Sequence, residues 1–341
     1  MRAGIGRAVQ MEATVSILYV VTPGASIRKH GDTFRVTSPD GMLLEEIEGN
    51  RLESALVLSS VDVTTQAMAS MLRQGVELAI MAQDGTLLGQ LTPPMGRNIL
   101  LRREHYRKQS DAAFALARAK EVVDAKVHNQ REVLVRQISD HGVTPEVEMA
   151  AAQIEAMLPR IAQAPDADVL RGLEGACARH YWAAFGTMLK ADGIAFSGRR
   201  FHPSPDPANA VLSLGYMLLC SSLNSMLDAM GFDPFLGFFH TEAYGRPSLA
   251  LDLVEPYRAP VVDRLAVRLF NLRVLKTDDF EPSDDGGVRL KVDALRVFFK
   301  AWEQRLGQMG VRLSIRSQAE GFRRVILGEQ DILQPYRWSS R

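Results

Sequence analysis

Short apolar runs with the two-residue period of β-strands follow one another along the first ninety residues. Gly31-Asp32 and Asp84-Gly85 separate neighbouring runs, and such pairs are typical of hairpin turns. One helix interrupts the strands, because Thr64 or Thr65 can cap its start and Gly75 suits its end. The pattern therefore predicts strands over 15–21, 26–30, 33–37, 42–48, 53–59, 76–82 and 86–91.

The apolar period changes to roughly 3.6 residues after the segment Thr92-Pro93-Pro94-Met95-Gly96. Pro256 and Pro260 lack an amide donor and should break or kink one of the helices that follow. The polar stretch Asp278–Gly287 is expected to be a surface loop, and the final thirty residues fit no single element. The predicted helices cover 98–109, 111–139, 145–163, 167–191, 208–230, 248–275 and 291–308.

These patterns predict an α+β fold, with a small N-terminal β domain over 1–91, a linker over 92–97 and a larger all-α domain over 98–341. The 341 residues carry forty basic and forty acidic side chains. This zero net charge argues against nonspecific coating of nucleic acid, but it permits a local basic face. Cys177 and Cys220 lie too far apart for a zinc ribbon and do not suggest a disulfide framework.

The most apolar stretch, Ala208–Met230, is interrupted by several polar residues, and the first twenty residues show no secretory signal. We therefore expect a cytoplasmic protein without a membrane span. The sequence has no glycine-rich phosphate loop, GxSxG elbow or HExxH motif. Nucleotide hydrolysis and serine-type hydrolysis are accordingly disfavoured.

Acidic residues and one histidine in the helical region are the candidates for chemistry. Glu174 lies between Gly172 and Gly175, where two glycines weaken a helix but would let a phosphate or another backbone approach. The simpler interpretation of Glu174 is a solvated glutamate. His240 follows an aromatic run, Phe235–Phe239, and its simpler interpretation is a core histidine with both nitrogens satisfied.

Asp252 and Glu255 are three residues apart and would lie on one face of a helix. An ordinary ion pair between Glu255 and Arg258 is an equal alternative to a functional role. Two carboxylates and one imidazole suit Mg²⁺ or Mn²⁺. The spacing alone does not establish that Glu174, His240 and Glu255 converge.

Three segments resemble the Cas1 family of CRISPR-associated proteins: GLEGACARHY at 172–181, PANAVLSLGYML at 207–218 and HTEAYGRPSLALDLVEPYRAPVVDR at 240–264. The third is the most specific, because its histidine, D-L-x-E, Y-R and V-D-R groups follow the family order. LYVVTPGASIRKHGDTFRV at 18–36 is similar to the family's opening hairpin. The resemblance spans roughly Leu18–Arg305.

This resemblance implies a β-sandwich-like N-terminal domain, a helical catalytic domain and a homodimer. It implies that Glu174, His240 and Glu255 bind Mg²⁺ or Mn²⁺, with Asp252 as a supporting carboxylate. Pro256, directly after one of these ligands, departs from the family pattern. The implied activity is that of a metal-dependent DNA endonuclease and integrase. It joins the 3′-hydroxyl ends of a captured fragment to the CRISPR repeat by transesterification, in a heterohexameric complex with Cas2.

DNA would have to be held through its phosphates by basic side chains. The candidates are Arg102, Arg103, Arg107, Lys108, Arg199, Arg200, Arg246 and Arg258. For each of them, a solvated basic face or an internal ion pair is an equal alternative. Two other functions stay open: a DNA-binding scaffold without chemistry, and a helical metallohydrolase acting on small phosphoesters.

Overall fold

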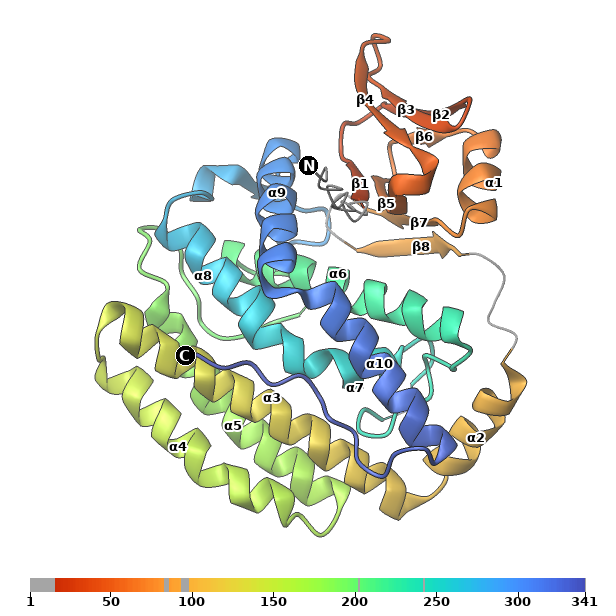
Figure 1. The fold of residues 1–341 in the computed structure, drawn as a ribbon. Helices are drawn as coiled ribbons and strands as arrows, with labels where there is room; N and C mark the ends of the chain where they lie inside the picture. Colours follow the sequence, from red (N-terminus) through yellow and green to blue (C-terminus); the bar gives the residue numbers. More distant parts are fainter. Residues whose placement is uncertain (1–15, 83–85, 93–97, 202, 242, 341) are drawn as a thin grey trace, which may run out of the picture. The chain divides into compact units, whose positions relative to one another are not determined.

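The computed structural model describes residues 16–82, 86–92, 98–201, 203–241 and 243–340, which belong to two compact units (Figure 1). The described part of the N-terminal unit holds two four-stranded sheets and one α-helix, α1 (Thr65–Arg73). One sheet has the order β1 (Ser16–Val20), β5 (Leu52–Leu58), β7 (Glu77–Met81), β8 (Leu87–Leu91). The other has the order β4 (Leu43–Glu48), β3 (Thr33–Thr37), β2 (Ser26–His30), β6 (Asp62–Val63).

The β2–β3 hairpin confirms the predicted turn at Gly31-Asp32. His30 pairs with Thr33 across the turn, and Gly31 adopts a φ of 58°, which glycine reaches without a steric penalty. The second predicted turn, at Asp84-Gly85, lies outside the described residues. β1, β5 and β7 run parallel, and β8 is antiparallel to β7. The largely buried β5 is a central strand, because β1 and β7 flank it.

Both sheets and α1 contribute to one hydrophobic core in this unit. Leu18 and Val57 come from one sheet, Ile27 and Phe34 from the other, and Met71 from α1. The hydroxyl of the residue before α1, Thr64, accepts a hydrogen bond from Ala67 N at 3.3 Å and caps the helix as predicted. The arrangement confirms the expected sandwich-like packing.

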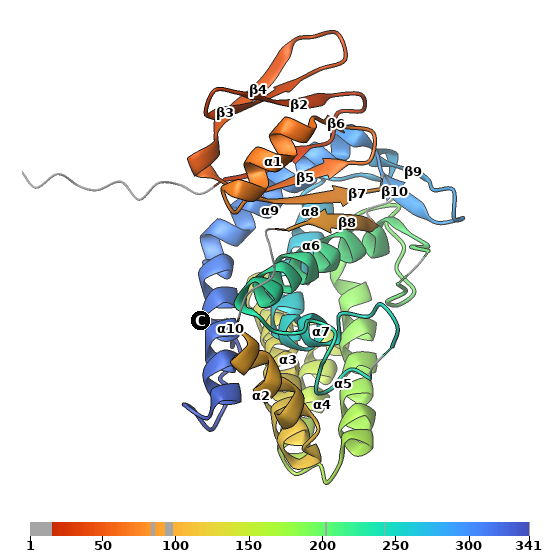
Figure 2. The same cartoon turned by 90° about the vertical axis from the view of Figure 1, so that its right-hand side faces the viewer.

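The helical unit follows the predicted 3.6-residue pattern closely. α3, α4 and α5 lie side by side in both views (Figures 1 and 2), and α7 packs against α3 and α6. The helices are α2 (Ile99–Gln109), α3 (Ala112–His141), α4 (Pro145–Ala162), α5 (Ala167–Met188), α6 (Pro207–Met230), α7 (Ser248–Tyr257), α8 (Arg264–Asn271), α9 (Val292–Met309) and α10 (Val311–Leu327).

Local sequence signals set several of these helix ends. The carboxylates of Asp111, Asp166 and Asp206 accept backbone hydrogen bonds at the first turns of α3, α5 and α6. The predicted helix over 248–275 runs from 248 to 271 and changes its winding near its prolines: α7 ends at Tyr257, a π-helical segment covers 258–263, and α8 follows.

The prediction of a surface loop over Asp278–Gly287 is wrong in part. Phe280–Pro282 (β9) pairs with Val288–Leu290 (β10) as a small antiparallel ribbon. Burial of Phe280 and Leu290, which face each other across the ribbon, stabilises this pairing. The final thirty residues, for which the sequence predicted no element, form most of α10 and then an extended segment.

α6 is the one described helix that is long and apolar enough to cross a membrane, and 56% of its most apolar window is buried inside the protein. The core helix of a soluble protein has the same properties. α6 also packs closely on the π-helical segment at Gly215, where an added Cβ would lie 2.5 Å from Val262 Cγ1. This glycine therefore sets how near the two elements approach.

We expect Gly215→Ala to lower the free energy of unfolding by ~1–3 kcal/mol, because the new methyl group overpacks the contact with Val262. Gly307→Ala in α9 is the matched control, since its Cβ would meet no atom within 4 Å. That variant should gain up to about 1 kcal/mol from helix propensity. Urea unfolding of both variants checks the prediction, which fails if their stabilities change alike.

Candidate active site

Three helices of the helical unit bring two carboxylates to one ammonium group. Lys126 on α3 places its Nζ 2.5 Å from Glu174 Oε1 on α5 and 2.7 Å from Glu255 Oε2 on α7. Glu255 is almost fully buried, whereas the side chain of Glu174 is 21% exposed. The structure therefore brings together two of the three residues that the family resemblance implied as metal ligands.

Lys126 was missed by the sequence analysis, although its position carries a signal. On α3 it falls on the same stripe as Val122, Gln130 and Val133, which are all buried. A lysine on such a stripe needs an internal partner, because an unpaired buried charge is costly. Its helical spacing from these neighbours could have identified it as a functional candidate.

The third implied ligand, His240, is held by Asp252. The His240 Nδ1 lies 2.6 Å from Asp252 Oδ1, and the backbone N–H of His240 donates to the same oxygen at 2.9 Å. The N–H groups of Phe238 and Phe239 donate to Asp252 Oδ2 at 2.7 and 3.0 Å. The loop can wrap this carboxylate so closely because a Cβ at Gly237 would lie 2.6 Å from it.

Asp252 thus serves as a buried acceptor that fixes the imidazole ring. The opposite ring nitrogen, Nε2, lies 3.7 Å from Glu255 Oε1, and the side chain of His240 is 18% exposed. Metal-binding histidines commonly donate their second ring N–H to a carboxylate in this way. Glu174, His240 and Glu255 therefore lie in one cluster, with Asp252 behind the histidine.

The opposite charges in this cluster stabilise the ionised forms of Glu255 and Lys126. Burial alone would raise the pKa of Glu255, but Arg258, Lys126 and His240 outweigh it and lower that pKa to about 2. Burial also acts to lower the pKa of Lys126, whereas Glu255 and Glu174 raise it above its usual value. Glu255 is therefore ionised and Lys126 is protonated at neutral pH.

Arg258 does not fit the predicted role of a DNA contact. Its Nη1 lies 2.9 Å from Glu255 Oε1, and its guanidinium lies over the ring of Tyr216 at 4.9 Å. The side chain is only 16% exposed. The simpler alternative, an ion pair with Glu255, is the one that the structure shows.

Arg199 is likewise held inside the protein. Its Nη1 donates to Asn209 Oδ1 at 2.9 Å, its Nη2 donates to Ser213 Oγ at 3.0 Å, and its guanidinium lies over Phe201. Burial accordingly lowers the pKa of Arg199. Because these contacts occupy both Nη atoms and one face of the guanidinium, Arg199 does not fit the predicted role of a DNA contact.

The other basic candidates are more accessible. Arg107 pairs with Glu104 at 2.8 Å, and the Nζ of Lys108 lies 5.0 Å from the Phe114 ring centroid. Three of the candidates are exposed, Arg103, Arg107 and Arg200, and three are partly buried, Arg102, Lys108 and Arg246.

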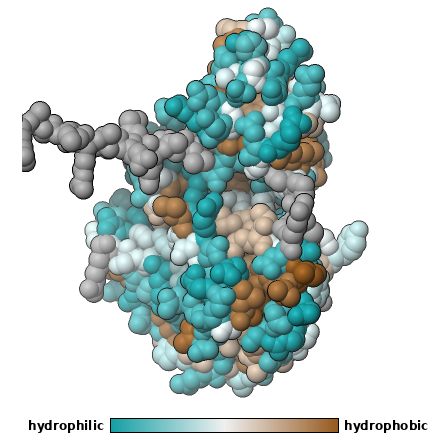
Figure 3. All heavy atoms as spheres, turned by 45° about the vertical axis from the view of Figure 1, so that its right-hand side comes forward, coloured by the Kyte–Doolittle hydropathy of each residue, from teal (hydrophilic) through white to brown (hydrophobic). Residues whose placement is uncertain are grey.

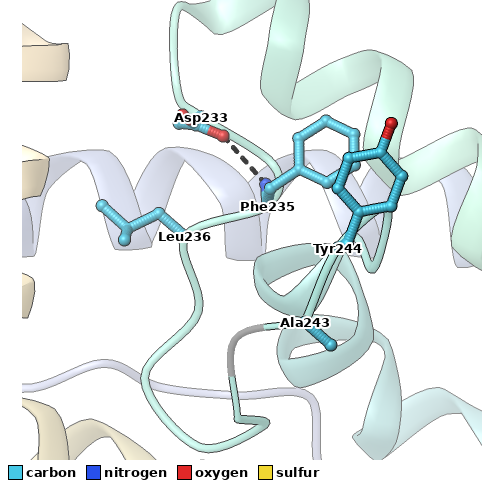
Figure 4. A pocket seen from close by; sticks show the side chains of 5 residues that line it. All are labelled: Asp233, Phe235, Leu236, Ala243 and Tyr244. Carbon is cyan, nitrogen blue, oxygen red and sulfur yellow. Dashed lines mark hydrogen bonds between the residues drawn. The ribbon is translucent and has the colours of Figure 1, made fainter.

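A pocket of about 360 Å³ opens in the connection between α6 and α7, the same connection that carries His240. Figure 4 shows the rings of Phe235 and Tyr244 at one end of this pocket and Leu236 at the other. Phe235 and Tyr244 are both strongly exposed. The face drawn in Figure 3 is mostly hydrophilic, with several brown apolar patches.

Within the described residues, no three His, Cys, Asp or Glu side chains are gathered tightly enough to hold a metal ion as they stand. Lys126 lies between the two carboxylates that would have to share one. The cluster thus has the ligand types of a divalent-metal site, with an ammonium group in contact with two of them.

A family model described as "CRISPR associated protein Cas1" matches residues 18–304. This chain belongs to the Cas1 family. CRISPR-associated endonuclease Cas1 2 of Rhodospirillum rubrum is 35% identical to it, over 96% of this chain and 100% of the relative. CRISPR-associated endonuclease Cas1 3 of Thermus thermophilus is 32% identical, over 94% of this chain and 97% of the relative.

Solved structures agree with this family assignment at the level of the fold. A Cas1 protein from Thermotoga maritima superposes with a TM-score of 0.79 and 20% identity, over 92% of this chain and 97% of that one. A casposase bound to an integration product gives 0.81 and 20% identity, with 95% of each chain covered. The family resemblance seen in the sequence is confirmed.

Asp263, in the V-D-R group of this Cas1-family chain, is buried behind the site. It accepts hydrogen bonds from Tyr181 Oη at 2.8 Å and Tyr216 Oη at 2.5 Å. Burial raises its pKa to about 7, although both tyrosines and the nearby Arg199 oppose this effect. The folded protein therefore binds a proton at Asp263 more tightly than the unfolded chain does.

A raised pKa stabilises the fold below the unfolded value, 3.8, and this contribution is lost as the pH rises through about 7. We therefore expect the stability of Asp263→Asn, relative to wild type, to rise between pH 4 and pH 8 by up to about 4 kcal/mol. Urea unfolding of both proteins across this range measures the difference. A difference that stays constant with pH would refute the raised pKa.

Proposed function

We propose that this chain is a divalent-metal-dependent DNA endonuclease and strand-transfer integrase of CRISPR adaptation. It joins the 3′-hydroxyl ends of a captured DNA fragment to the CRISPR repeat by transesterification. The observation that carries the proposal is the meeting of Glu174 and Glu255 at the ammonium group of Lys126, with His240 Nε2 3.7 Å from Glu255 Oε1. Relatives named as Cas1 endonucleases, and a fold neighbour described as a casposase bound to an integration product, support it.

The residues present fit a divalent cation. Two carboxylates and an imidazole nitrogen are ligands that Mg²⁺ and Mn²⁺ both accept. The position between Glu174 and Glu255 favours a cation, because the ammonium of Lys126 already contacts both. The partial exposure of Glu174 and His240 leaves the cluster open to solvent on their side.

A bound divalent ion would stabilise the charge that develops on the phosphodiester and lower the pKa of the attacking hydroxyl. Glu174, Glu255 and His240 would hold it. Asp252 keeps the ring of His240 oriented, and Arg258 keeps Glu255 ionised. One phosphodiester bond forms as another breaks, so the reaction needs no nucleotide hydrolysis.

The backbone beside Glu174 offers room for DNA. A Cβ at Gly172 or Gly175 would meet no protein atom within 4 Å, so a phosphate could approach the helix closely there. The exposed rings of Phe235 and Tyr244 suit a nucleobase, since every base has a face that can stack. We propose phosphate contacts for Arg102, Arg103, Arg107, Lys108, Arg200 and Arg246.

We further propose that the chain is a cytoplasmic prokaryotic protein that forms a homodimer and binds Cas2 in a heterohexameric complex. Met42 and Leu43, at the start of the edge strand β4, are 60% and 52% exposed. Such an apolar edge is a liability unless a partner covers it. A fold neighbour described as a Cas6-RT-Cas1–Cas2 complex, with a TM-score of 0.83 and 24% identity, covers 96% of this chain and 37% of its own.

Strand transfer by the purified protein tests this function directly. The reaction contains Cas2, Mn²⁺, a labelled short duplex with free 3′-hydroxyls and a supercoiled plasmid that carries the host repeat. We expect wild type to join label to the plasmid, Asp252→Asn to lose about 10–100-fold, and His240→Ala to lose at least as much. His141→Ala, an exposed histidine at the end of α3, is the control and should retain activity.

Joining by His240→Ala at the wild-type rate would contradict the site assignment while leaving the integrase in place. DNA binding that is unchanged by EDTA, with no joining under Mg²⁺ or Mn²⁺, would instead establish the DNA-binding scaffold.

A further inference from the structure

An extended segment after α10, Asp331–Ser340, runs along α3 and is called the strap here; Figure 1 shows it as the dark-blue trace that ends at the C-terminus. It has no partner strand among the described residues, so side chains must satisfy its backbone polar groups. Successive turns of α3 supply them through Arg118, Glu121, Asn129, Glu132 and Arg136.

Asn129 connects the strap to the helix that carries Glu255. Its Nδ2 donates to the carbonyl of Pro256 at 2.6 Å and to that of Tyr336 at 2.9 Å, and its Oδ1 accepts from Trp338 N at 2.8 Å. The carbonyl of Pro256 is available because Pro260, four residues later, has no N–H to donate. Asn129 is fully buried, so these contacts fix its amide.

Gln318 on α10 also connects the strap to α7. Its Nε2 donates to the carbonyl of Leu253 at 2.5 Å, and its Oε1 accepts from Tyr336 N at 2.8 Å. The ring of Tyr336 also stacks on Tyr257, with centroids 4.7 Å apart and an interplanar angle of 5°. Two buried amides thus hold the backbone of Tyr336, and each also holds a carbonyl of α7.

We propose that the strap, acting through Tyr336, Asn129 and Gln318, positions Glu255 in the metal cluster. The two α7 carbonyls that it secures, at Leu253 and Pro256, lie on either side of Glu255 in the chain. α3 contributes two of the contacts that locate this part of α7, through Lys126 to the carboxylate and through Asn129, one turn later, to the backbone.

This inference rests on the proposed function, because it concerns the same ligand set. Ligands must be held within about 0.5 Å of a productive geometry, and partners behind the ligands commonly change metal affinity by about 10–100-fold. Tyr336, Asn129 and Gln318 are positioning residues, because their hydrogen bonds and the Tyr336 stack reach backbone groups and Tyr257 and not the proposed metal ligands' side chains. Their loss should weaken metal binding while leaving DNA affinity unchanged.

The test is a titration of the full-length protein with Mn²⁺, followed by electron paramagnetic resonance of the free ion. Gln318→Met keeps the length of the side chain and removes the amide, and Tyr336→Ala removes the stack on Tyr257. We expect both to weaken Mn²⁺ binding by about 10–100-fold. Tyr336→Phe, which retains the ring and the backbone contacts, should bind Mn²⁺ as wild type does.

Met71→Ala, a buried truncation in the N-terminal unit, controls for a general loss of stability. Wild-type Mn²⁺ affinity in Gln318→Met and Tyr336→Ala would overturn the inference, as would an equal loss in Met71→Ala. If wild type itself binds no Mn²⁺, the proposed function fails together with the inference. Weaker Mn²⁺ binding in Gln318→Met and Tyr336→Ala, with normal binding by wild type and Met71→Ala, therefore tests the inference separately from the proposed function.

Discussion

One ammonium group, that of Lys126, links α3 to a carboxylate on α5 and to another on α7. Without Lys126, Glu174 and Glu255 would face each other as like charges in a largely buried cluster, and the pKa of at least one would rise. Removing one partner from a buried ion pair typically costs ~3–5 kcal/mol. The same arrangement makes the cluster attractive to a divalent cation, so its structural and proposed functional roles share one electrostatic origin.

The rest of the helical unit supports this cluster from behind. Asp252 gathers three backbone N–H groups and the imidazole of His240, which leaves Nε2 on the side of Glu255. Arg258 pairs with Glu255 and lies over Tyr216. The prolines that interrupt the helix after Glu255 would leave carbonyls without donors, and the buried amide of Asn129 supplies one for Pro256.

The sequence predicted most elements because their signals are local. Strand alternation, the Gly31-Asp32 turn and the Thr64 cap depend only on neighbouring residues, and the structure agrees with them. The convergence of Glu174, His240 and Glu255 could not be derived from spacing, since it depends on how separate helices pack; it came from the family resemblance. The partners of Lys126 and of the strap could not be predicted because their contacts are long-range: the spacing of Lys126 on α3 shows only the stripe that it shares, and the strap has no periodicity of its own.

We propose that Lys126 stands where Glu174 and Glu255 would share a divalent cation. The most direct measurement is the anomalous scattering of crystals of the protein grown with Mn²⁺. We expect one manganese peak at about 2–2.6 Å from an oxygen of each glutamate and from His240 Nε2, with the Lys126 ammonium displaced. An ammonium that still bridges both carboxylates at saturating Mn²⁺, with no peak at the cluster, would contradict it.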